Sequence, residues 1–130
     1  MAHPIMFDDD DPLLARVSDI ALGFPGAQVK VSHGRPAFYT QKVFAYYGGS
    51  LKVDGEYVQH RHSVMSLPDE AERPALLQDE RCYVPAYLGP SGWLGIDLEP
   101  QSDWAEIAEL IEESYRLTAR KGLVKELDAR

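Results

Sequence analysis

The fold is decided by the stretch AFYTQKVFAYYGGSLKVDGEYVQHRHSVM, which runs from Ala37 to Met65. It is rich in aromatic and β-branched residues, which favour strands. Gly48-Gly49-Ser50 is expected to end the first strands, and Asp54-Gly55 is typical of a tight hairpin turn between the runs on either side of it. The stretch therefore predicts about three antiparallel strands in a meander.

A helix is predicted before this stretch, in the segment DPLLARVSDIALGFPG. Its apolar residues recur at helical spacing, Asp11 can cap its first turn, and Pro12 suits the first helical position. Gly23 and the Pro-Gly pair after it end the pattern. The expected helix runs from about Pro12 to Leu22.

Two further helices and two strands are predicted after the meander. The segment LPDEAERPALLQDE indicates a helix that starts at Pro68 and is disturbed at Pro74, because an interior proline removes a hydrogen bond. CYVP and GWLGIDL are expected to be strands, and a final helix begins near Asp103, where Asp103 and Glu106 match a capping box. The predicted order is α-β(3)-α-β(2)-α, an α+β fold with an antiparallel sheet and helices packed on one face.

Length and composition bound the organisation of the chain. A chain of 130 residues with 45% hydrophobic residues suits one domain, which we place at residues 12–120, between an acidic N-terminal tail at 1–11 and a C-terminal tail at 121–130. No apolar run approaches the roughly 20 residues of a membrane span, and the N-terminal residues lack the pattern of a signal peptide. We therefore expect a soluble, cytoplasmic protein. Its single cysteine, Cys82, excludes an intramolecular disulfide and is expected to be a small buried hydrophobe.

The charge is unevenly distributed. The chain carries a net charge of −8, yet residues 28–62 hold five basic and two acidic residues, a net of +3, so the rest carries −11. One interpretation is that water-facing strand positions simply carry lysine and arginine. The other is a locally basic surface for a polyanion, although the overall charge opposes broad phosphate binding.

Four segments resemble successive motifs of one family. HGRPAFYTQKVFAYY, LPDEAERPALL, YVPAYLGPSGWLGIDL and DWAEIAELIEESYRLTA are similar in order and spacing to those of the MmcQ/YjbR family of small bacterial proteins, over roughly residues 12–120. The resemblance implies the same element order, similar to that of secretion chaperones, and a DNA-binding role without a catalytic residue set. Met65 departs from the pattern, because family members often have a lysine there that would contact an anion.

The strongest candidate site is the segment His33-Gly34-Arg35-Pro36. Glycine tolerates positive φ, and proline holds the preceding residue extended, so a sharp entry into a strand explains Gly34 and Pro36. His33 and Arg35 are left unexplained by the turn. A titratable donor beside a guanidinium would suit a phosphate or a carboxylate.

Other motifs carry less chemistry. His60 and His62 alternate onto one face of a strand, which is a spacing for two ligands of a transition metal, but no third ligand is evident. YLGPSGW lacks the lysine and the following helix of a phosphate loop. Ser32 and Ser63 near histidines do not make a triad. We therefore expect no metal, no cofactor and no catalytic residues.

Two hypotheses of different classes remain. The first is a non-catalytic module that binds nucleic acid or an anionic partner through the basic, aromatic hairpin region. The second is a small-ligand binder or enzyme with a pocket around His33 and Arg35, to which Tyr87 and Trp93 could contribute. The candidate binding residues of both hypotheses together are His33, Arg35, Lys42, Tyr46, Tyr47, Arg61 and Trp93.

Overall fold

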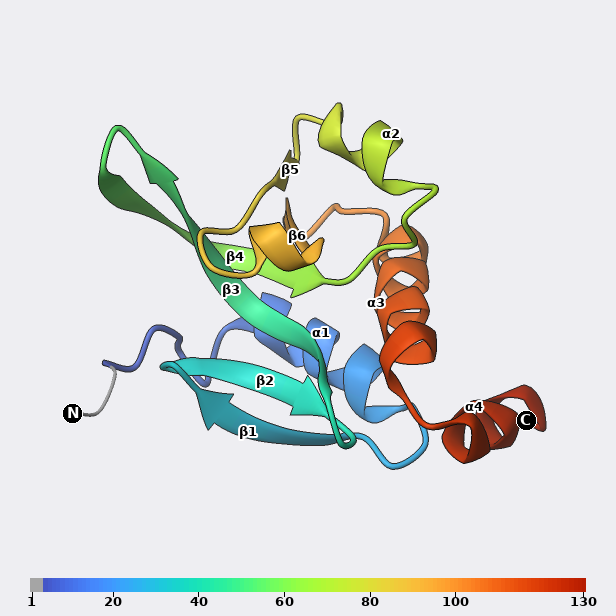
Figure 1. Ribbon diagram of the computed structural model, residues 1–130. Coiled ribbons are helices and arrows are strands. Elements are labelled where there is room, and N and C mark those ends of the chain that lie inside the picture. The colour runs from blue at the N-terminus through green and yellow to red at the C-terminus, as the bar shows by residue number, and fades with distance from the viewer. Residues whose placement is uncertain (1–3) are drawn as a thin grey trace.

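The computed structural model describes residues 4–130, which form a six-stranded antiparallel sheet and four α-helices (Figure 1). The strand order is β1-β2-β3-β4-β6-β5. The predicted α+β class is thereby confirmed. The elements in chain order are α1 (Pro12–Leu22), β1 (Gln28–Ser32), β2 (Arg35–Tyr39), β3 (Val43–Val53), β4 (Glu56–Ser66), α2 (Arg73–Leu77), β5 (Cys82–Tyr83), the 3-10 turn η1 (Gly89–Ser91), β6 (Leu94–Asp97), α3 (Trp104–Thr118) and α4 (Lys121–Asp128).

The meander is present, with one strand more and one turn fewer than expected. β1 lies before the predicted strands and pairs with β2. Gly48-Gly49-Ser50 does not end a strand, because β3 continues through it to Val53 and only shifts register between Tyr47 and Gly49. The Asp54-Gly55 turn is confirmed, and both of its residues have positive φ. The long β3–β4 hairpin extends beyond the rest of the sheet (Figure 1).

Helix α1 has the predicted bounds. The Asp11 side chain accepts a hydrogen bond from the Leu13 amide at 2.9 Å, and Pro12 is in the first helical turn. Both features depend on neighbouring residues alone, which is why sequence rules located them.

The later helices differ from the prediction. α2 is a single short helix that begins at Arg73, because Pro74 occupies its first turn instead of disturbing the interior of a longer helix. α4 forms over residues that we had assigned to a C-terminal tail, and it packs Leu123 and Leu127 against the core.

The two faces of the sheet are covered differently. On one face, α1 and α3 bury the main core, which contains Phe44, Tyr47 and Val64 of the sheet. Met65 follows Val64 in β4 and so points to the other face, where it packs with Tyr83 and Trp93 in a smaller cluster. In Figure 1, α1 lies behind the sheet and the β5–β6 connection in front of it. This second face is only partly covered.

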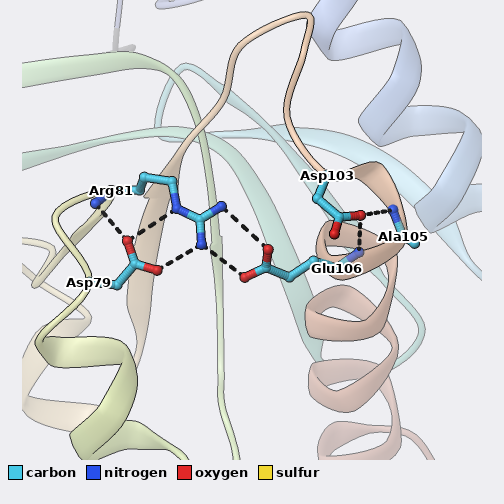
Figure 2. Close-up of polar contacts among 5 residues, drawn as sticks. All are labelled: Asp79, Arg81, Asp103, Ala105 and Glu106. Atoms are coloured by element: carbon cyan, nitrogen blue, oxygen red, sulfur yellow. Dashed lines mark hydrogen bonds and ion pairs between the residues drawn. The ribbon is translucent and has the colours of Figure 1, made fainter.

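An arginine fixes the chain before β5 to the start of α3 (Figure 2). Arg81 donates to Asp79 at 2.7 Å and to Glu106 at 2.9 Å. Asp103 caps α3 through the amides of Ala105 and Glu106, as predicted, but the Glu106 carboxylate contacts Arg81 instead of completing a capping box. The hydrogen bonds from Arg81 lower the pKa of Asp79 to about 2.

None of the helices within residues 4–130 combines the length and the apolar character that crossing a bilayer would need.

Candidate functional site

A cavity of about 610 Å³ lies on the partly covered face of the sheet. Its walls come from the turn between β1 and β2, from β3 and β4, from residues Pro85–Leu88 before β6, and from the segment before α1. It lies beside the smaller core cluster, with which it shares Tyr46, Met65 and Leu88. This volume is within the range of pockets for small molecules.

Arg35 is the central polar residue of this cavity. It is 8% exposed, and it is the one charged residue that is buried in the described part of the chain. Its Nη2 donates to the Gln59 side-chain oxygen at 2.5 Å. Its Nη1 is buried without a hydrogen-bond partner, and among residues 4–130 no carboxylate lies within ion-pair distance of the guanidinium.

Gly48 provides the space for this guanidinium. At the register shift, Gly48 of β3 faces three residues of β4, so the ladder is interrupted at this position. Gly48 has φ +81°, and a Cβ placed on it would lie 2.7 Å from Arg35 Nη1. A glycine inside a strand is typical of a bulge or of a site where another group comes close to the backbone. Gly48 meets both conditions, because it lies at the irregular register and Arg35 Nη1 packs against it.

The turn between β1 and β2 holds the segment before α1 against the cavity. His33 and Gly34 are its two central residues, with φ +54° and +80°, which is the pattern of a two-residue hairpin turn. The Met6 amide donates to the Gly34 carbonyl at 2.8 Å, and a Cβ on Gly34 would collide with the Pro4 carbonyl. Gly34 is thus required for both its φ and its packing, and Pro4 and Met6 become part of the cavity wall.

The other walls are largely aromatic and apolar. The ring of Tyr46 contacts Trp93, with centroids 5.9 Å apart, so the buried Trp93 supports a cavity wall without lining it. Tyr57 and Tyr87 stack with centroids 5.9 Å apart and an interplanar angle of 21°, and their hydroxyls are 2.8 Å apart. Both are exposed, at 48% and 77%, so they stand at the rim.

The electrostatics around Arg35 disfavour its charge. Burial lowers the pKa of Arg35 below its usual value, nearby Tyr83 opposes this, and the like charge of Arg61 adds to the lowering. Burial also raises the pKa of Tyr83 to about 12, so this hydroxyl is neutral at physiological pH and supplies no counter-charge. The guanidinium remains protonated at all ordinary pH values.

The predicted site residues separate into two groups. His33, Arg35 and Tyr46 line the cavity, with Trp93 behind Tyr46. The others lie elsewhere. Lys42 is exposed in the turn between β2 and β3, whereas Tyr47 and Arg61 line a second cavity of about 410 Å³ near the start of α1.

That second cavity contains a hydrogen-bonded cluster around Asp11. Tyr47, which is only 1% exposed, donates its hydroxyl to Asp11, and His62 Nδ1 lies 3.0 Å from the same carboxylate oxygen. Burial alone would raise the pKa of Asp11, but the hydrogen bond from Tyr47, together with the Leu13 amide and His62, lowers it overall. The cluster joins the cap of α1 to β3 and β4, so Tyr47 is placed for packing and not for stacking on a base.

His60 and His62 do not share a face as the strand period predicted. The irregular register beside Gly48 breaks the alternation between them. His60 stacks on Tyr83 and lies 2.7 Å from Asp97, whereas His62 contacts Asp11. Among the described residues, no group of three or more metal-binding side chains is placed around either histidine.

Reasoning from sequence missed Gln59, Met6 and the pair Gly48-Gly49 at the Arg35 site. Gln59 and Met6 carry no local signal, because an exposed polar strand residue and an N-terminal methionine are ordinary. Gly48-Gly49 did carry one, since paired glycines inside a strand-forming run are also typical of a bulge.

A family model described as YjbR matches residues 22–117, which is most of the chain and includes every strand. No curated protein matches this chain.

Proposed function

The chain belongs to the YjbR family, and we propose that it is a small-molecule-binding protein that holds an anionic group on Arg35. The family membership sets no ligand. The proposal depends on the chemistry of the cavity around this guanidinium.

The observation that carries the proposal is a buried charge without a counter-charge. Removing a charged group from water is costly unless it is paired and hydrogen-bonded. Arg35 is 8% exposed, has one unpartnered nitrogen, and has a neutral amide as its side-chain partner. Packing alone would be served better by an apolar residue of similar length. An arginine at the wall of a cavity is therefore best explained by an anion that enters the cavity.

Gln59 can act as a substitute for that anion in the free protein. Its side-chain oxygen occupies the position on Nη2 that a ligand oxygen would take. Gln59 is exposed, so its side chain can turn toward solvent when a ligand replaces it. Exchange of a neutral oxygen for a charged one strengthens the hydrogen bond to the guanidinium.

The same features favour a small ligand over a nucleic-acid strand. Stacking on bases needs free aromatic rings, whereas Phe38 and Tyr47 of the hairpin region are 0% and 1% exposed, and the exposed ring of Tyr57 already stacks on Tyr87. Lys30 and Lys52 lie over the rings of Tyr39 and Tyr57. Arg35 itself is only 8% exposed, which disfavours its contact with a backbone phosphate of a duplex.

A double-mutant cycle tests the proposal without a known ligand. Gln59→Glu supplies an internal carboxylate to Arg35, and we expect it to raise the free energy of unfolding by about 1.5–3 kcal/mol, the scale of a hydrogen bond to a charged group. The gain should disappear when Arg35→Met is also present. Arg35→Met alone should equal or exceed the wild type in stability, because it removes a buried charge. Arg61→Met is the matched control, since Arg61 is exposed and should change stability by less than about 0.5 kcal/mol.

Anions provide the second arm of the experiment. The melting temperature is measured with sodium acetate, benzoate and phosphate against sodium chloride at equal ionic strength, because a ligand that binds only the folded state stabilises it. At least one anion should raise the melting temperature of the wild type and of Arg61→Met, but not of Arg35→Met. A strongly destabilised Arg35→Met, or a Gln59→Glu gain that persists without Arg35, would show instead that Arg35 is structural.

A further inference from the structure

The cavity around Arg35 has features that select among anions. This inference rests on the proposed function, that is, on anion binding at Arg35, and it concerns the ligand class. Three properties of the lining decide it: the number of charges, the shape of the group that Arg35 accepts, and the character of the remaining walls.

The charge count favours a monoanion. Arg35 is the one arginine or lysine among the residues that line the cavity. A dianion such as a phosphate monoester would bring a second negative charge into a lining that holds no second arginine or lysine and is largely apolar, with Met6, Met65 and Leu88 beside the uncharged hydroxyls of Ser32 and Ser50, so the desolvation of that charge would be repaid poorly. The net charge of −8 on the chain also opposes dianions at a distance.

The hydrogen-bond geometry favours a planar carboxylate. The present partner of Nη2 is the oxygen of a planar amide, which a carboxylate resembles in size and shape. Nη1 still lacks a partner. When Gln59 turns away, a carboxylate can accept from both terminal nitrogens of the guanidinium, which is the preferred bidentate geometry of this pair.

The walls favour a flat aromatic body. Tyr46, Tyr57 and Tyr87 all line the cavity, and Met6 and Met65 add polarisable sulfur atoms. The Tyr57–Tyr87 pair bridges β4 and the chain before β6. Lys52 lies over the ring of Tyr57, so Tyr87, which is 77% exposed, offers the aromatic face at the rim. Offset stacking and methionine contacts with an aromatic ring are both favourable here.

We infer that the ligand of this site is an aromatic monocarboxylic acid, with its carboxylate on Arg35 in place of Gln59 and its ring between the tyrosines at the rim and Met65.

The inference is tested with four probes of related shape. Binding of 2-naphthoate, 2-naphthyl phosphate, 2-naphthol and octanoate to the full chain is measured by isothermal titration calorimetry. We expect 2-naphthoate to bind at least about tenfold more tightly than each of the other three, a difference of about 1.4 kcal/mol. Gln59→Glu should abolish naphthoate binding, because its own carboxylate occupies Arg35, while Gln59→Ala should keep it.

Rim variants separate the aromatic component from the charge. Tyr87→Leu should weaken the binding of 2-naphthoate about fivefold and change the affinity for octanoate by less than about twofold, because only the naphthyl ring can stack on Tyr87. Tyr39→Leu is the matched control, because Tyr39 lies outside the cavity lining. If 2-naphthyl phosphate or octanoate bound as tightly as 2-naphthoate or more tightly, and this binding required Arg35, the ligand class would be wrong. The proposal that Arg35 binds an anion would still hold. Absence of Arg35-dependent binding of every anion, inorganic phosphate included, would overturn both.

Discussion

Gly48→Ala tests whether the irregular register at Gly48, where β4 bulges opposite β3, exists to house Arg35. The residue has φ +81°, and a Cβ there would lie 2.7 Å from Arg35 Nη1. Two costs are therefore expected. An L-residue in the left-handed region costs about 1–2 kcal/mol. Displacement of the guanidinium also breaks its bond to Gln59, which is worth about 1.5–3 kcal/mol for a hydrogen bond to a charged group.

Gly55→Ala separates these two costs. Gly55 has φ +84°, almost the same as Gly48, but a Cβ on it would meet nothing within 4 Å. It should therefore lose only the backbone component, about 1–2 kcal/mol. Gly48→Ala should lose about 2.5–5 kcal/mol, the two components together.

The assay is urea unfolding followed by circular dichroism, with free energies from linear extrapolation. In an Arg35→Met background the loss of unfolding free energy from Gly48→Ala should fall to that of Gly55→Ala, because the guanidinium that the new Cβ would obstruct is gone. Equal losses at the two glycines in the wild-type background would refute the reasoning, and the bulge would then need another explanation.

Three further outcomes are expected. Trp93→Ala should lower the free energy of unfolding by about 3–5 kcal/mol because Trp93 is 8% exposed, and Trp104→Ala should lower it by less because Trp104 is half-buried. Denaturant unfolding of both variants measures these losses. A Trp104→Ala protein as stable as the wild type would contradict the packing of α3. Arg81 lowers the pKa of Asp79 to about 2, so the stability from this pair is complete above the ordinary value of 3.8 and is lost as the pH falls through about 2. Urea midpoints between about pH 4 and pH 2 should therefore fall less steeply in Arg81→Met, and identical slopes would rule out the pair as the cause. Dialysis against EDTA should leave the melting temperature unchanged, because His60 and His62 contact different aspartates. A fall in the melting temperature that added zinc reverses would identify a metal site.

The sequence by itself determined the features that depend on a few neighbouring residues. Asp11, Pro12 and Gly23 bound α1 where capping rules place it, and Asp54-Gly55 forms the predicted hairpin turn. Hydrophobic period predicted the order of helices and strands except for β1 and α4, and the family motifs along the chain agree with the match over residues 22–117. In each case the cause acts within about one turn of chain, so it can be read without knowing what lies across the fold.

Only the tertiary structure decided what surrounds Arg35. The bulge at Gly48 depends on register with β4, and the same irregularity separates His60 from His62. The burial of Arg35, its contact with Gln59 and the cavity wall at Met6 each join residues that are far apart in sequence. Tyr47 shows the same limit, because its aromatic neighbourhood in sequence indicated stacking, whereas Asp11 and His62 hold it in the core. Whether a charged or aromatic side chain is covered depends on its neighbours in space, and those neighbours are set by strand pairing rather than by local sequence.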